Sequence, residues 1–259
     1  LFYGSTEQGV MTMPREGDIR PETSGPPVPW VEIKLSDEGE ILIRNRYPYS
    51  GYYKDQEATE GKIEDGWFYT GDFGHLTDDG HLIVIDRMDD LKELAGGKKF
   101  SPQYTEIRLR FSPYIKDALV IGGPDRDYVT CIINIDLDNV GRFAENLHIA
   151  YTTFTDLSQK KEVVNLITRE IVKVNQTLPE WTRIRKFVNL HKEFDADEDE
   201  LTRTRKLRRT FVEDRYRELI DMLYGDKEEY RVEASVTYRD GRKGKIETAI
   251  FINELQEER

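Results

Sequence analysis

The chain has 259 residues, of which 37% are hydrophobic and 34% are charged, and its formal net charge is −12 at pH 7. These values are typical of a folded, water-soluble protein with one large domain or two modest ones, and they exclude a disordered chain. The acidic balance excludes wholesale binding of nucleic acid but leaves a local basic site open, and no apolar run reaches the roughly 18 residues of a membrane span.

The first third of the chain predicts β-structure. Residues 30–35 and 40–44 alternate between apolar and polar side chains, and the turn residues between them indicate a hairpin. Residues 67–69 predict a short aromatic strand, and a tight Asp-Asp-Gly turn precedes another strand at residues 81–85. These segments predict a β-rich, barrel-like unit.

The second part of the chain predicts mixed structure. Residues 117–121 and 129–135 are continuous apolar runs, which predict buried strands. Residues 158–176 have apolar side chains at helical spacing, with a proline just beyond the end. The predicted fold class is therefore α+β, with a β-rich unit at residues 1–86 and a small mixed unit at residues 87–259.

Two more elements are predicted toward the C-terminus. A helix over about residues 205–223 would bury one face, formed by Leu207, Phe211, Tyr216, Leu219, Ile220 and Leu223. Alternation at residues 232–238 and 245–252 predicts a terminal hairpin, to which we assign no function. An acidic run at residues 193–200 precedes five basic residues at 203–209; composition alone indicates a solvated loop and a solvated helix face.

Five short segments, in order along the chain, carry a resemblance to a known family. They are Tyr3-Gly4-Ser5-Thr6-Glu7, Gly51-Tyr52-Tyr53-Lys54-Asp55, Gly66-Trp67-Phe68-Tyr69-Thr70-Gly71-Asp72, Asp86-Arg87-Met88-Asp89-Asp90 and Leu201-Thr202-Arg203-Thr204-Arg205-Lys206. Each alone is a weak signal, but together they resemble the adenylate-forming (AMP-binding) superfamily of acyl-CoA synthetases, luciferases and peptide-synthetase adenylation domains.

Two details resemble the long-chain fatty-acyl branch of that superfamily. One is the form Leu-Thr-x-Thr-x-Lys, and the other is the long stretch between Asp138 and Leu190. The more common ending of the family has a glycine before the lysine, where this chain has Arg205. That departure fits the branch but adds a bulky charge beside the lysine.

The resemblance implies an ATP-dependent ligase that works in two steps. The carboxylate of a long-chain fatty acid attacks the α-phosphate of ATP to give acyl-AMP and pyrophosphate. The thiol of coenzyme A then displaces AMP to give the thioester. The implied cofactors are ATP/AMP, Mg²⁺ and coenzyme A, and the implied substrates are a fatty acid and coenzyme A.

The first segment would contact the nucleotide. The resemblance implies that Tyr3 stacks on adenine, that Gly4 allows the backbone close to the acyl-AMP, and that Thr6 offers a hydroxyl to the α-phosphate. Glu7 would hold Mg²⁺, a hard cation that prefers carboxylate and phosphate oxygens. Taken alone, this pentapeptide would indicate only an N-terminal strand.

Two further residues would hold the ribose. The carboxylate of Asp72 could accept both ribose hydroxyls, although an Asp after a strand and a glycine can also cap its own turn. Arg87 has a planar fork that could bond a ribose oxygen while its charge faces the nucleotide. Asp89 occupies the place that the family uses as a hinge, so that the small domain presents one face for adenylation and another for thioester formation.

The small unit would supply the remaining site residues. Gly96, Gly97 and Lys98 resemble the family segment beside the pantetheine tunnel, where glycines let a thin ligand approach and Lys98 could meet a phosphate; paired glycines also occur in ordinary loops. Lys206 matches the catalytic lysine, whose ammonium at the start of a helix would bridge the attacking carboxylate and the α-phosphate.

The sequence leaves three functions open. The favoured one is an acyl-CoA ligase, the second is an acyl-AMP ligase that loads a carrier protein, and the third is a non-catalytic protein-interaction module. The presence of Asp72, Arg87 and Lys206 argues against the third. Complete family members have a Ser/Thr/Gly-rich loop for the β- and γ-phosphates and most of the fatty-acid pocket before the position of Tyr3. We therefore expect the 259 residues alone to be inactive.

Location and assembly follow from a few features. Cys131 is the only cysteine, so an internal disulfide is impossible and a reducing cytoplasm is favoured. The chain starts at Leu1 without an initiator Met or a secretory signal, so we expect it to begin inside a longer gene product. The basic run leaves peripheral contact with the inner membrane face open, and uncovered sheet edges leave a homodimer open. The four histidines lack the spacing of a zinc site.

Overall fold

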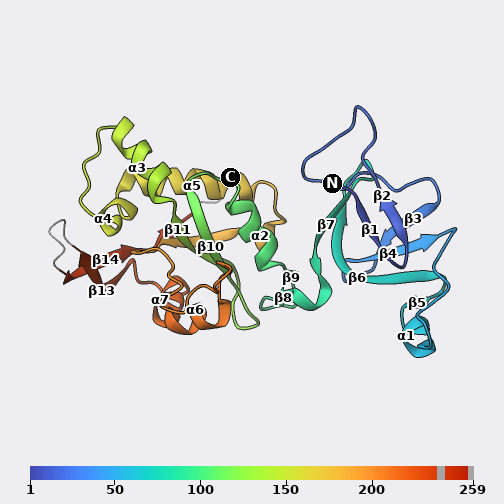
Figure 1. Cartoon of the computed structure of the whole chain (residues 1–259). Helices are drawn as coiled ribbons and strands as arrows, with labels where there is room; N and C mark the ends of the chain where they lie inside the picture. The colour runs from blue at the N-terminus through green and yellow to red at the C-terminus, as the bar shows by residue number, and fades with distance from the viewer. Residues whose placement is uncertain (238–242, 256–259) are drawn as a thin grey trace. The chain divides into compact units, whose positions relative to one another are not determined.

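The computed structural model describes residues 1–237 and 243–255 and divides the chain into two compact units, Leu1–Leu91 and Lys92–Arg259 (Figure 1). The division lies a few residues beyond residue 86, where the sequence pattern changes. In the part of the chain that the structure describes, no helix is both long and apolar enough to cross a membrane.

The first unit is almost entirely β-structure. Its elements are β1 (Tyr3–Ser5), β2 (Gly9–Thr12), β3 (Val31–Leu35), β4 (Glu40–Asn45), α1 (Gln56–Glu60), β5 (Ile63–Glu64), β6 (Trp67–Leu76), β7 (Leu82–Arg87) and the 3-10 turn η1 (Met88–Asp90). β1 and β2 pair with each other, and the other strands form a five-stranded sheet in the order β3-β4-β6-β5 with β7 on β6. The predicted hairpin is confirmed as β3 and β4, which pair in antiparallel register.

The core of the first unit lies on one face of this sheet. Its buried side chains are Met11, Val28, Val31, Ile41, Ile43, Phe68 and Leu82. Along β3, Val31, Ile33 and Leu35 are buried or partly buried and the residues between them are exposed, as the sequence alternation predicts.

The second unit mixes helices and strands. Its elements are β8 (Lys92–Glu93), β9 (Lys99–Phe100), α2 (Pro102–Leu109), β10 (Ile115–Ile121), β11 (Val129–Ile135), α3 (Leu137–Asn146), α4 (Phe154–Ser158), α5 (Lys161–Asn175), η2 (Glu180–Thr182), β12 (Ile184–Asn189), α6 (Arg209–Arg215), α7 (Arg217–Leu223), β13 (Glu229–Thr237), β14 (Lys243–Phe251) and β15 (Asn253–Glu254). The main sheet has the order β10-β11-β12-β15. β11 and β12 run parallel, which requires a long crossover, and α3, α4 and α5 lie within it.

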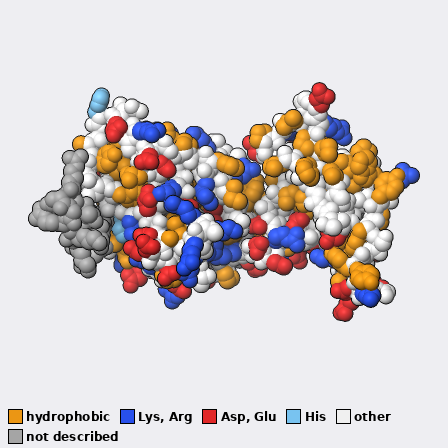
Figure 2. Space-filling model, in the orientation of Figure 1, with side chains coloured by type: hydrophobic (Ala, Val, Ile, Leu, Met, Phe, Trp, Pro, Cys, Tyr) orange, Lys and Arg blue, Asp and Glu red, His pale blue; other side chains and the backbone are white. Residues whose placement is uncertain are grey.

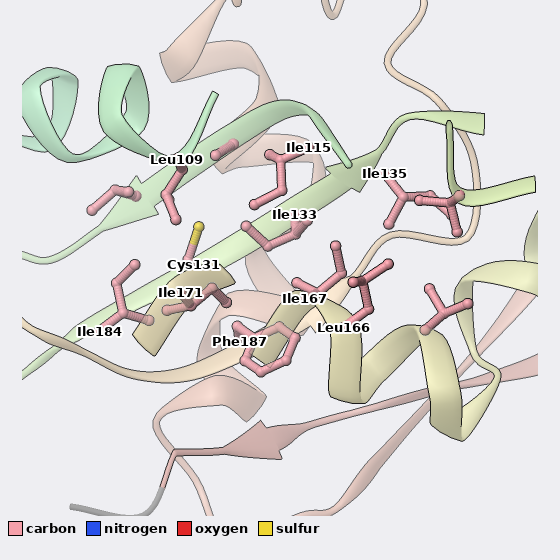
Figure 3. Close-up of a cluster of buried hydrophobic side chains, with 14 of the residues drawn as sticks. Leu109, Ile115, Cys131, Ile133, Ile135, Leu166, Ile167, Ile171, Ile184 and Phe187 are labelled. Atoms are coloured by element: carbon pink, nitrogen blue, oxygen red, sulfur yellow. The ribbon is translucent and has the colours of Figure 1, made fainter. Parts of the chain in front are cut away.

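Both faces of this sheet are covered, which explains the continuous apolar run of β11. On one face, Cys131, Ile133 and Ile135 pack with side chains of α5 such as Leu166 and Ile171 (Figure 3). The other face packs against α6 and α7. Every residue of β11 is buried as a result, and the α+β prediction for the chain is confirmed.

The helix predicted over residues 205–223 is wrong in its start and its continuity. Helix α6 begins only at Arg209, and Tyr216, with φ −101° and ψ 21°, separates α6 from α7. Residues before α6 form a closed loop in which the amide of Lys206 donates to the Thr202 hydroxyl, a side-chain bond that competes with helix. Phe211 is 37% exposed and Val212 is fully buried, so the buried face of α6 differs from the predicted one.

The predicted terminal hairpin is confirmed as β13 and β14, which pair from Glu229 with Phe251 to Thr237 with Lys243. Its turn lies outside the described residues.

The helix predicted over residues 158–176 is confirmed as α5, with residue 158 at the end of α4 instead.

Candidate functional site

The polar site of the first unit lies where β6 pairs with β7. The register places Asp72 directly opposite Arg87, and Arg87 Nη1 donates to Asp72 Oδ1 at 2.6 Å. The hydroxyl of Tyr3 donates to Asp72 Oδ2 at 2.5 Å, although 69 residues separate the two in sequence. The structure thus brings together the adenine and ribose residues expected from the sequence.

A local distortion of β6 turns Asp72 into this position. Gly71 has φ +74°, a left-handed conformation that favours glycine. The pairing of β6 with β4 is irregular at this point. The amide of Gly71 donates to Glu40 Oε1 at 2.7 Å, and the amide of Asp72 donates to Thr70 Oγ1 at 3.1 Å. The Thr-Gly-Asp sequence therefore builds a bulge that presents a carboxylate.

Burial and charge distinguish the three members of this cluster. Burial, strengthened by the hydrogen bond to Asp72, raises the pKa of Tyr3 well above its usual value, so its hydroxyl stays a donor. The nearby Asp72 carboxylate raises the pKa of Arg87, whose side chain is 59% exposed. Each carboxylate oxygen accepts one protein hydrogen bond and has a lone pair left. Asp72 can therefore accept two ligand hydroxyls while Tyr3 and Arg87 hold it in place.

The other residues of the first segment lie in or just after β1. A Cβ added at Gly4 would lie 2.6 Å from the carbonyl oxygen of Gly9, so the β1–β2 hairpin itself requires glycine there. Thr6 is exposed in the turn after β1. Glu7 accepts a hydrogen bond of 2.8 Å from the hydroxyl of Tyr52. A hydrogen bond from its own backbone, together with that of Tyr52, lowers the pKa of Glu7.

Glu7 fits Mg²⁺ as a single protein ligand. Across residues 1–237 and 243–255, no group of three His, Cys, Asp or Glu side chains could hold a metal ion by itself. Mg²⁺ is commonly held by one or two carboxylates together with substrate phosphates and water. A half-exposed Glu7 whose pKa is lowered suits that arrangement.

Sequence reasoning missed three residues of this region. Tyr52 orients Glu7, and Glu40 holds the Gly71 amide. Lys62 points toward the same glycine, since its Nζ lies 3.7 Å from where a Gly71 Cβ would be. Tyr52 belongs to a quoted motif and could have been singled out, but no local pattern marks Glu40 or Lys62.

In the second unit, Gly96 and Gly97 form the turn of the β8–β9 hairpin. Their φ values are +88° and +82°, so both positions favour glycine. The turn is closed by two backbone hydrogen bonds, from the Leu94 amide to the Lys98 carbonyl and from the Gly97 amide to the Leu94 carbonyl. The side chain of Lys98 is exposed and its Nζ lies 5.3 Å from the ring centroid of Trp181. A rigid, glycine-tipped loop with a cation beside it can approach a thin phosphate-bearing ligand.

Lys206 lies in a tight loop ahead of α6 and is exposed. Leu201 and Leu207 form a β-bridge across the base of the loop. The amide of Thr202 donates to the carbonyl of Lys206 at 2.8 Å, and the amide of Lys206 donates to the hydroxyl of Thr202 at 3.0 Å. The loop thus fixes the main chain of Lys206 while its ammonium extends into solvent.

The basic run around Lys206 divides into two kinds of cation. Arg208 pairs with Asp199, and Arg209 pairs with Glu106, so these two have structural partners. Arg203, Arg205 and Lys206 are exposed. Acidic and basic side chains are interspersed on the visible face of this unit (Figure 2). The solvated helix face predicted from composition is therefore partly a set of ion pairs.

Asp89 lies in η1, near the end of the first unit, and is exposed. The 3-10 turn is short, and Leu91, which follows it, is extended with φ −68° and ψ 142°. Asp89 therefore occupies the stretch at which the chain passes from one unit to the other.

The chain is similar in sequence to known proteins. The model of the AMP-binding enzyme C-terminal domain matches residues 89–228. A long-chain-fatty-acid–CoA ligase of Mycobacterium bovis is 32% identical over 224 residues, covering 86% of this chain and 37% of the relative. A long chain acyl-CoA synthetase of Arabidopsis thaliana is 29% identical and covers 78% and 33%. The chain thus spans about a third of the length of these relatives.

Solved structures show the same fold. Apo MatB from Rhodopseudomonas palustris is 21% identical, with a TM-score of 0.58, and the match covers 84% of this chain and 40% of MatB. An anthranilate CoA ligase solved with anthranoyl-AMP is 22% identical, with a TM-score of 0.51, and the match covers 85% and 39%.

Proposed function

Because this chain belongs to the AMP-binding enzyme family, we propose that it is the C-terminal part of a long-chain fatty-acid–CoA ligase that forms acyl-AMP from ATP. The carboxylate cluster of Tyr3, Asp72 and Arg87 is the observation that supports this most strongly. It offers oriented acceptors for a diol beside a cation, which suits a ribose with its phosphate.

In this proposal the first unit binds the nucleotide. Asp72 accepts the ribose hydroxyls, and Arg87 bonds a ribose oxygen and adds positive charge. Tyr3 places its ring against adenine and its hydroxyl on Asp72. Thr6 contacts the α-phosphate from the exposed turn, and Gly4 keeps the hairpin narrow beneath it. Mg²⁺, when bound at Glu7, would neutralise phosphate charge.

The second unit serves the two chemical steps with different loops. Lys206 would neutralise the charge that builds between the attacking carboxylate and the α-phosphate. Gly96, Gly97 and Lys98 would border the pantetheine arm and a phosphate of coenzyme A. Asp89 would be the hinge that exchanges the two loops, since a rotation of one stretch of chain can present two faces of a domain.

The deciding experiment is Lys206→Ala in the full-length protein that contains this chain. Acyl-AMP formation from ATP and a long-chain fatty acid, and thioester formation from supplied acyl-AMP and coenzyme A, are measured separately. We expect the first rate to fall by about 10²–10³-fold, the cost of one preorganised charge-stabilising group. The second rate should survive.

The matched control is Arg203→Ala, which removes another exposed cation from the same loop. It should leave both rates near wild type. Equal survival of both rates in Lys206→Ala would overturn the role of the lysine. Transfer to a carrier protein without any dependence on coenzyme A would overturn the proposed acceptor.

A further inference from the structure

A fully buried carboxylate lies at the base of the loop that carries Lys206. The side chain of Glu200 has 0% exposure, although the acidic run around it predicts a solvated loop. Its Oε2 accepts from Lys192 Nζ at 2.7 Å and from the Asp195 amide at 2.9 Å. Its Oε1 accepts from the Tyr216 hydroxyl at 2.7 Å and lies 3.3 Å from Arg215 Nε.

This set of partners is complete for a buried carboxylate. Four donors converge on two oxygens, and two of the donors are cations. A buried charge is retained in a folded protein only when it is paired and hydrogen-bonded in this way. Lys192 and Arg215 also bind Glu198, which fixes their positions from the other side. Glu200 is therefore held in a single orientation.

Three successive pairs of contacts connect the main chain of Glu200 to that of Lys206. The carbonyl of Glu200 accepts from the amide of Arg208 at 2.9 Å. Next along the loop, Leu201 bridges Leu207. Thr202 and Lys206 then exchange two hydrogen bonds, one of them through the threonine hydroxyl. The two sides of the loop are thus paired from the buried carboxylate up to the exposed lysine.

We propose that Glu200 is a positioning residue for Lys206 and acts through this paired loop. The inference rests on the proposed function, because it assigns Glu200 to the adenylation step. Glu200 touches no substrate. Its buried side chain fixes the main chain of the loop from which the exposed Lys206 side chain extends.

A buried carboxylate is a costly way to stabilise a loop, since apolar residues of similar volume often do so equally well. It is a good way to fix an orientation, because each donor specifies a direction as well as a distance. The partners come from two segments: the stretch after β12, 5–8 residues before Glu200, and the junction of α6 with α7, up to 16 residues after it. The position of the loop is therefore fixed relative to both segments.

The first test is Glu200→Gln in the full-length protein. Either orientation of the amide turns an NH₂ group toward donors, so the four-donor site cannot be satisfied. We expect kcat for acyl-AMP formation to fall by about 10²-fold, as a misplacement of about 1 Å can cause. The KM for ATP and the rate of thioester formation from supplied acyl-AMP should stay unchanged, because other residues carry them.

A pair of tyrosine variants separates positioning from folding. Tyr216→Phe removes one donor to Glu200 and should give a smaller loss in the same step. Tyr224→Phe removes another half-buried hydroxyl of the same unit, one that donates to the Ile121 carbonyl at 3.0 Å. It should leave both half-reactions unchanged. The inference would be overturned if Glu200→Gln lowered the rates of both half-reactions in parallel. It would also be overturned if the two tyrosine variants had equal effects on these rates.

The effect of Glu200 on the loop can also be tested without an activity assay, by amide hydrogen exchange in the 259-residue chain. The amides of Lys206 and Arg208 should exchange faster in Tyr216→Phe than in Tyr224→Phe, while amides of β11 stay protected. Unchanged exchange of the loop amides would overturn the inference. A wild-type full-length protein that forms no acyl-AMP would instead overturn the proposed function, and the exchange result would still decide whether Glu200 fixes the loop.

Discussion

Arg205 holds a backbone conformation that its residue type disfavours. Its φ is +59°, in the left-handed region, and its side chain is exposed. The related sequences with glycine at this position would adopt that conformation without strain. We therefore expect Arg205→Gly to stabilise the second unit relative to Arg205→Ala, which removes the same charge but keeps a Cβ.

The expected size follows from two opposing terms. A left-handed conformation costs a residue with a Cβ about 1–2 kcal/mol. Glycine loses more conformational freedom on folding, which costs about 0.5–1 kcal/mol relative to alanine. The net difference at position 205 should thus favour glycine by about 0.5–1 kcal/mol. Since both variants lack the arginine, the loss of its charge near Asp117 cancels.

The matched control is the same pair of changes at Arg203, which is exposed in the same loop and is not among the positive-φ residues. There glycine should be less stable than alanine by about 0.5–1 kcal/mol. Stability is measured from hydrogen exchange of the slowest amides of β11, which report global unfolding of this unit. If glycine lowers stability equally at both positions, the strain assigned to Arg205 does not exist.

Two further changes test the ionisable groups of the second unit. Burial, with the charge of Lys192 adding to it, lowers the pKa of His191 to about 4, below its usual value of about 6.5. The unfolded chain therefore binds the proton first, and stability should fall as the pH drops from about 6.5 to about 4, by up to about 1.4 kcal/mol per pH unit. Urea unfolding should show a flatter profile for His191→Gln, and an identical profile would refute the assignment. Glu106→Ala should cost about 1–3 kcal/mol, because it leaves the Val120 amide and the Arg209 guanidinium without their shared acceptor; the exposed Glu145→Ala is the control, and equal losses would contradict this reasoning.

Periodicity predicted the elements whose burial is regular. The hairpin of β3 and β4, the strands β10 and β11 and the helix α5 were all predicted. Each shows a regular pattern: alternation in the hairpin, a continuous apolar run in strands buried on both faces, and helical spacing in α5. The prediction failed for the region before α7. The loop at 202–207 starts α6 only at Arg209, and the predicted face included Phe211, whereas the structure buries Val212 four residues before Tyr216.

Charge patterns were weaker guides than apolar ones. The run at residues 193–200 indicates solvated carboxylates, yet Glu200 is fully buried. Its burial depends on Lys192, Arg215 and Tyr216, whose convergence is a property of the tertiary fold. The same limit applies to Lys62 and Glu40, which approach Gly71 across strands. The motifs of the family resemblance singled out Asp72 and Arg87, and the register of β6 with β7 places these two residues opposite each other.

In the part of the second unit that the structure describes, two of the three non-glycine residues with positive φ lie in or beside one loop; the third is His148. Asp199 and Arg205 both have positive φ, +64° and +59°. Between them lies the fully buried Glu200. Strained conformations and buried charges persist only where the surrounding structure over-determines them, and such places are often functional. A loop whose only task was to connect β12 to α6 would need neither. This concentration supports assigning the loop to a chemical step, with Lys206 as the group that the strain and the buried charge hold in place.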